Sequence, residues 1–204
     1  MEWGNASDIT SAGCNIIMAS AAIYAAYNAK SWFSQRSHTK GFDKAEEIIA
    51  KIDNYVRFAN GSLADLKSTF ETLDGITNWL AQPDINLKKK YGTLAEEHRL
   101  QNILIEELKE EVNLIERWSI KVKNKSVIDI NLRLLSLIHT FAHDTYLKAS
   151  TAIDYITNKS KSDFDEIFTE FKGNFNNFQS NLDYLNNVYE EFKGKKFTFF
   201  FKVK

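Results

Sequence analysis

The sequence predicts an all-α protein: an N-terminal transmembrane helix followed by a cytoplasmic antiparallel bundle of long helices. Three observations predict this class. The 204 residues include one proline and eight glycines, too few for a loop-rich β sandwich or barrel. Apolar residues recur at helical spacing along most of the chain. An uncharged run near the N-terminus is about as long as a bilayer is thick.

Composition excludes several classes of protein. Lys plus Arg is 26 and Asp plus Glu is 27, a net charge of −1, which argues against a nucleic-acid coat or an acidic tail. One cysteine excludes a disulfide scaffold and a cysteine-based zinc finger. Fifteen Phe argue against disorder. The expected divisions are an N-terminal tail and transmembrane helix at 1–30, a juxtamembrane linker at 31–41, a helical bundle at 42–194 and a basic-aromatic tail at 195–204.

The uncharged run extends from Ile9 to Ala29. At about 1.5 Å per residue it is roughly 30 Å long, the thickness of the hydrocarbon layer. Acidic residues precede it and basic residues follow it, so the positive-inside rule places the N-terminus outside the bacterial inner membrane and the rest in the cytoplasm. The expected interface anchors are Trp3, Lys30, Trp32, Phe33 and Arg36.

Small and polar residues form a narrow stripe along this run. Their spacing alternates between three and four residues: Ala12, Asn15, Ala19, Ala22, Ala26 and Ala29. In lipid, such a stripe lets helix backbones approach closely, and an asparagine can hydrogen-bond across the contact. The stripe predicts a span that self-associates through this face. The alternative is an Ala-rich helix packed inside a soluble bundle.

Two helices and a loop are predicted after the linker. Apolar residues at helical spacing predict a helix over 42–60, ending near Asn60-Gly61. A second helix is expected over 62–81 with Ser62 as its N-cap. Pro83 and the polar residues around it predict a loop over 82–93.

Three further helices are expected. One covers 94–123. The next, 126–158, is apolar on so much of its surface that it should be central in the bundle. The last runs from Phe164 to Phe192, with Gly194 as its stop. Its apolar heptad seam contains five Phe, too bulky for a tight parallel dimer, which favours an antiparallel bundle within one subunit.

The tail at 195–204 changes period. Phe197, Phe199, Phe201 and Val203 alternate as in a strand, although no strand partner is evident in an otherwise helical chain. Three interpretations stay open: a frayed terminus, a strand added to a partner's sheet edge, or contact with anionic lipid.

Motifs for chemistry are sparse. His139 and His143 are four residues apart, but the Glu of a metalloprotease motif is absent, and His139 is predicted to be a core histidine. The segment Arg133 to His139 fits R-x5-H and resembles the ribonuclease motif of HEPN helical domains, in which Arg and His act on an RNA phosphodiester. Those domains place the motif near the end of their last helix, whereas a whole helix follows here. We therefore expect no catalytic residue, no metal and no cofactor.

The overall order of segments resembles another group. A short acidic end, a weak span from Ile9 to Ala29, the junction Lys30-Ser31-Trp32-Phe33 and a helical bundle are similar to small single-pass bacterial membrane effectors of anti-phage defence, including retron-associated ones. The resemblance is architectural. It implies a toxin silenced by a cytoplasmic sensor and released on infection. The implied partners are the lipid bilayer, further copies through the transmembrane helix, and a cytoplasmic protein or ribonucleoprotein, without direct nucleic-acid binding. A non-toxic membrane-anchored adaptor and a HEPN-like ribonuclease are the alternatives.

Overall fold

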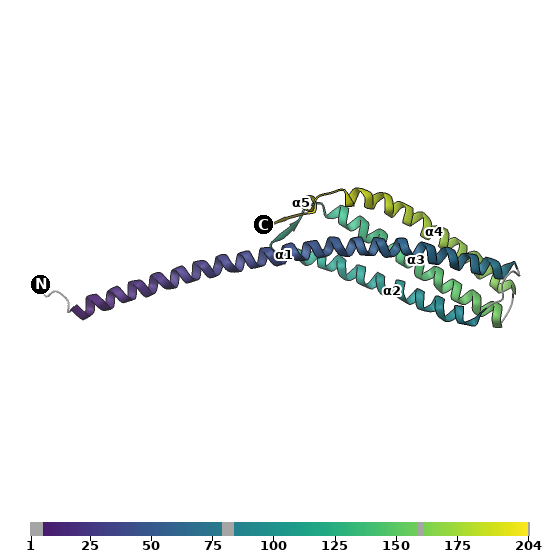
Figure 1. Cartoon of the computed structure of the whole chain (residues 1–204), viewed down its shortest axis with the longest axis horizontal. Helices are drawn as coiled ribbons and strands as arrows, with labels where there is room; N and C mark the ends of the chain where they lie inside the picture. The colour runs from purple at the N-terminus through teal and green to yellow at the C-terminus, as the bar shows by residue number, and fades with distance from the viewer. Residues whose placement is uncertain (1–5, 79–83, 159–160, 204) are drawn as a thin grey trace.

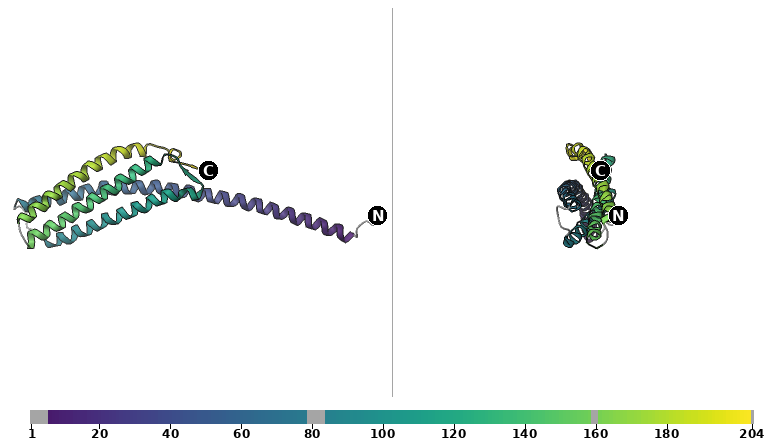
Figure 2. Two further views of the ribbon diagram at one scale, coloured as in Figure 1. Left: turned by 180° about the vertical axis from the view of Figure 1, so that it is seen from behind. Right: turned by 90° about the vertical axis from the view of Figure 1, so that its right-hand side faces the viewer.

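The computed structural model describes residues 6–78, 84–158 and 161–203, and it confirms the all-α class (Figure 1). The long helices are α1 (Ala6–Thr77), α2 (Ile85–Leu114), α3 (Lys125–Asn158) and α4 (Lys161–Lys193). The short elements are η1 (Ile115–Trp118), β1 (Ile120–Val122), α5 (Phe197–Phe200) and β2 (Phe201–Val203). The C-terminal half of α1 forms an elongated bundle with α2, α3 and α4, while its N-terminal half projects from one end (Figures 1 and 2).

Helix α3 lies at the centre of the bundle, as its sequence predicts. It packs against α1, α2 and α4. Its predicted seam is buried: Ile128, Leu132, Leu135, His139, Ala142, Tyr146, Ala149 and Ile153. The Phe seam of α4 is also buried within the subunit, and Phe70 of α1 packs on three of its rings at centroid distances of 5.7–6.3 Å. The predicted antiparallel bundle is therefore confirmed.

The expected helix end near Asn60-Gly61 is wrong, because α1 is continuous through it. The side chains that suggested a break are used elsewhere. Asn60 forms a reciprocal amide pair with Asn186 of α4, with both N···O distances at 2.9 Å. The Ser62 hydroxyl donates to the Phe58 carbonyl one turn back instead of capping a new helix. Residues 31–41, expected as a linker, also lie within α1.

The expected loop at 82–93 is wrong over 85–93, which is helical, while 82–83 lie outside the described residues. Asp84 caps α2 by accepting a hydrogen bond from the backbone N–H of Asn86 at 2.9 Å. The other end of this helix was predicted at 123 but comes at Leu114. Ser119, after η1, has a left-handed backbone with φ of 62°, and this turn starts the short strand β1.

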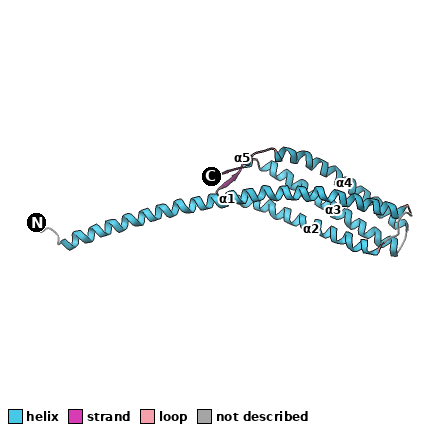
Figure 3. Cartoon of the chain, in the orientation of Figure 1, coloured by secondary structure: helices cyan, strands magenta, loops and turns pink. Residues whose placement is uncertain are grey.

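Only the end of the tail, Phe201–Val203, is a strand, and the strand-like alternation predicted from Phe197 is wrong over Phe197–Phe200, which is the helix α5. The strand finds its partner inside the chain, so the expectation that it has none is also wrong. Strand β2 pairs with β1 in antiparallel register, Ile120 opposite Val203 (Figure 3). Phe200 and Phe201 are each 1% exposed, and the Asn124 side-chain amide donates to the Phe199 carbonyl at 2.7 Å. The tail is therefore part of the folded bundle, at the end from which α1 projects.

Candidate functional site

The most unusual surface is the N-terminal arm, residues 6–40 of α1. Its large apolar side chains are exposed to solvent: Ile16, Ile17, Ile23, Tyr24 and Tyr27 are 67–73% exposed. The six residues of the predicted association face, Ala12, Asn15, Ala19, Ala22, Ala26 and Ala29, are exposed as well. The arm is thus a helix whose apolar and small-residue faces are both available to a partner.

Three of the predicted anchors, Lys30, Trp32 and Arg36, lie in the part of the arm nearest the bundle. Trp3 is outside the described residues, and so is the side chain of Phe33. Lys30 and Trp32 are exposed, and the Arg36 guanidinium lies 5.1 Å from the centroid of the Trp32 ring. Within the described residues, no helix is both long and apolar enough to cross a membrane.

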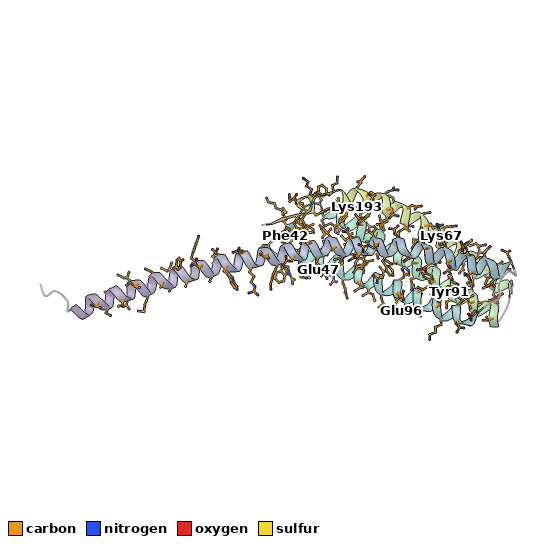
Figure 4. All side chains as sticks on the ribbon, in the orientation of Figure 1. Phe42, Glu47, Lys67, Tyr91, Glu96 and Lys193 are labelled. Atoms are coloured by element: carbon orange, nitrogen blue, oxygen red, sulfur yellow. The ribbon has the colours of Figure 1, made fainter. Side chains whose placement is uncertain are left out.

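The arm joins the bundle at Gly41, which is buried. A Cβ atom at this position would lie 2.2 Å from the carbonyl oxygen of Trp118 and 2.7 Å from Cγ1 of Ile120. The next residue, Phe42, packs on Phe197 of the tail with ring centroids 4.5 Å apart, and its side chain marks the junction in Figure 4. Glycine therefore allows α1 to lie directly against the backbone that follows α2.

A buried histidine pair is the main polar feature of the core. His98 of α2 and His139 of α3 are 3% and 0% exposed, and their Nδ1 atoms are 2.9 Å apart. Only one of these nitrogens can donate the proton, so protonating both rings would set two N–H groups against each other. Burial lowers the pKa of His98 to about 4, with a smaller contribution from His143. Burial likewise lowers the pKa of His139 to about 3, so the pair is neutral near pH 7.

The structure does not bring Arg133 and His139 to one surface. Arg133 is exposed, whereas His139 is fully buried and its Nε2 atom has no hydrogen-bond partner within the described residues. Six residues along a helix separate two side chains by about 120° around the axis. His139 is a core histidine, as predicted.

His143, which follows His139 by four residues, contacts the backbone of α2. Nδ1 of His143 is hydrogen-bonded to the Ala95 carbonyl at 2.9 Å. Among the described residues, no three His, Cys, Asp or Glu side chains are grouped closely enough to hold a metal ion.

Sequence analysis missed His98, the partner of His139. A signal for it exists in α2, where Tyr91, Ala95, His98 and Ile105 follow the helical spacing of buried positions. Tyr91, the first of these buried positions, fell inside the loop predicted at 82–93, so it was not recognised as part of a helix. Comparison of the chain with protein families, curated proteins and solved structures found no match.

Proposed function

We propose that this protein is a bacterial membrane effector that acts through its N-terminal arm. The arm inserts into the inner membrane, self-associates there and disrupts the membrane. The bundle remains on the cytoplasmic side, and a cytoplasmic sensor protein or ribonucleoprotein holds the effector silent until release. No enzymatic step is involved in this proposal.

The observation that supports it best is the exposure of the arm's apolar side chains. An ordinary surface helix turns its apolar stripe to the core. Here Ile17, Ile23 and Tyr27 are each at least 69% exposed, on a helix that projects away from the bundle (Figure 2). Large exposed apolar surfaces mark contacts with membranes or other proteins. At about 1.5 Å per residue, the uncharged run from Ile9 to Ala29 within the arm is roughly 30 Å long, about the thickness of a bilayer's hydrocarbon layer.

The small-residue stripe supports assembly rather than simple anchoring. Ala19, Ala22 and Ala26 would let a second helix approach closely, and Asn15 would donate a hydrogen bond across the contact. Each such hydrogen bond contributes about 0.6–2 kcal/mol in lipid. An inert anchor gains nothing from this pattern, since leucine at the same positions would insert more favourably.

The test separates assembly from insertion. Ala22→Leu adds apolar surface, so it should improve insertion while pushing the helices apart and reducing membrane depolarisation after induction. Ile16→Leu is the matched control, because this position lies outside the stripe and keeps its apolar character. The measurement is depolarisation in cells that lack any partner protein. If Ala22→Leu depolarises as strongly as the unmodified protein, the stripe is not an assembly face.

A second candidate is a non-toxic scaffold whose arm pairs with a partner helix. The polar residues Asn15, Ser20 and Asn28 within the arm favour it, because they tolerate water better than lipid. Fractionation without detergent distinguishes the two. Recovery of the full-length protein in the membrane fraction supports the effector, and recovery in the soluble fraction would leave the scaffold.

A further inference from the structure

A pocket of about 230 Å³ opens between α1 and α2, and one of its walls comes from α3. Its lining residues are Phe58, Gly61, Ser62 and Asp65 from α1, Leu94, Glu97 and His98 from α2, and Tyr146 from α3. Pockets for drug-sized ligands are about 300–1,000 Å³. This pocket therefore suits a smaller molecule.

The inner wall is aromatic and includes an unsatisfied polar atom. Tyr146 is 0% exposed, and its hydroxyl has no hydrogen-bond partner within the described residues. The rings of His98 and Tyr146 are stacked at 5.6 Å, and Phe58 meets His98 edge-on at 5.5 Å. An unpaired buried hydroxyl destabilises the folded chain, because it has lost its hydrogen bonds to water. A ligand that pairs with it would recover part of that loss.

The rim is negatively charged. Asp65 and Glu97 stand on facing helices, both exposed, and neither forms an ion pair with another described residue. Burial raises the pKa of Tyr146, and the charges of Asp65, Tyr91 and Glu97 raise it further. Asp65, Glu97 and Tyr146 line the same pocket. The adjacent His98 is neutral near pH 7 and does not offset these charges.

Gly61 leaves part of this space open. It lies within α1, where glycine is less favourable than alanine because its backbone loses more freedom on folding. A Cβ atom at Gly61 would meet no atom within 4 Å, so packing inside the chain gives no steric reason for a glycine. Gly61 is one of the residues that line the pocket, together with Phe58 and Asp65 of the same helix.

We infer that this pocket binds a small alkylammonium ion. The charged head lies between the carboxylates of Asp65 and Glu97 and donates to the Tyr146 hydroxyl oxygen, while the alkyl stem packs on Phe58. An ammonium group has three N–H donors, which matches these acceptors, and aromatic faces attract cations. The ion is either a free amine or the side chain of a lysine in a partner protein.

Calorimetric titration of the full chain with n-butylamine, near pH 7, tests the proposal. We expect millimolar affinity for n-butylamine and binding at least about fivefold weaker for n-butanol, its neutral analogue, because the carboxylates attract only the cation. Capped lysine distinguishes the two sources: tighter binding than n-butylamine indicates a lysine side chain, and weaker binding a free amine. Equal binding of n-butanol, or no binding of n-butylamine, would overturn the proposal.

Variants separate recognition from folding. Asp65→Asn and Glu97→Gln should each weaken amine binding severalfold, whereas Glu71→Gln, an exposed position on α1 outside the pocket, should leave it unchanged. Tyr146→Phe removes the unpaired hydroxyl, so it should raise the melting temperature of the free protein yet weaken binding. If Tyr146→Phe weakens neither amine binding nor the preference over n-butanol, the hydroxyl is not part of a site and the proposal fails.

Discussion

Two glycines of the same helix should respond in opposite ways to the same substitution. Within α1, replacing glycine by alanine increases helix stability by about 0.5–1 kcal/mol where the new methyl group has room. Gly61 has that room, since a Cβ atom at this position would meet no atom within 4 Å. Gly61→Ala should therefore stabilise the protein by about that amount.

Gly41→Ala should destabilise the protein instead. Its Cβ would lie 2.2 Å from the Trp118 carbonyl oxygen, and this neighbour is backbone rather than the end of a flexible side chain. Overpacking of this kind costs about 1–3 kcal/mol. Subtracting the gain of about 0.5–1 kcal/mol in helix propensity leaves a net loss of up to about 2.5 kcal/mol, and we expect the upper part of this range because a backbone carbonyl must move.

Thermal unfolding followed by far-UV circular dichroism measures both effects. For a chain of this size, 1 kcal/mol shifts the melting temperature by about 2–4 °C. Gly61→Ala should therefore melt above the unmodified protein and Gly41→Ala below it. If Gly41→Ala is as stabilising as Gly61→Ala, α1 does not pack against Trp118 and the close approach at Gly41 is incorrect.

Three further outcomes are expected. In the folded chain the pKa values of His98 and His139 are about 4 and about 3, below the ordinary value of 6.5. Between about pH 4 and pH 6.5 the unfolded chain therefore binds more protons than the folded chain, and the free energy of unfolding should fall as the pH drops below about 6.5. His139→Leu should reduce this decrease in the free energy of unfolding by up to about 1.4 kcal/mol per pH unit, as measured by urea unfolding near pH 7 and about pH 5. If the variant loses as much stability on acidification as the unmodified protein, the two histidines are not a buried neutral pair. Phe200→Ala should cost about 3–5 kcal/mol in the same assay, because this side chain is 1% exposed, and a loss under about 1 kcal/mol would indicate a frayed tail. A double-mutant cycle on Asn60 and Asn186 should give a coupling energy of about 0.5–1.5 kcal/mol, and additive effects would show that the amide pair contributes nothing.

The sequence predicted those parts of the fold that depend on apolar periodicity. The seam of α3 and the Phe seam of α4 are long and regular, so their helical assignment and burial followed directly. The errors lie where local signals compete with tertiary contacts. Asn60 and Gly61 together resemble a helix end, but the amide pair with Asn186 supplies an interhelical reason for the asparagine.

The short sheet and the histidine pair depend on contacts between distant residues. Strand β1 has three residues, too few for a periodic signal, and its partner β2 comes only after α3, α4 and α5 have intervened. His98 and His139 are 41 residues apart, and only the packing of α2 on α3 brings their Nδ1 atoms together. Nothing in one sequence identifies that pairing, although the spacing of Tyr91, Ala95 and His98 places the ring in the core.

The continuity of α1 changes how the proposed effector would be released. A linker at 31–41 would have let a membrane anchor move independently of the bundle, but these residues are helical and Gly41 is packed against Trp118. The arm and the bundle therefore share one helix axis. A sensor that silences the effector must then cover the arm itself, or hold the bundle away from the membrane, because folding the arm back would require breaking α1 within its 72 residues. Inserting Pro after Gln35 should permit such a break and weaken the coupling between arm and bundle, and limited proteolysis would detect it as a new cleavage site near residue 35. If the unmodified protein is already cleaved at this position, α1 is not continuous through the junction and does not transmit the orientation of the bundle to the arm.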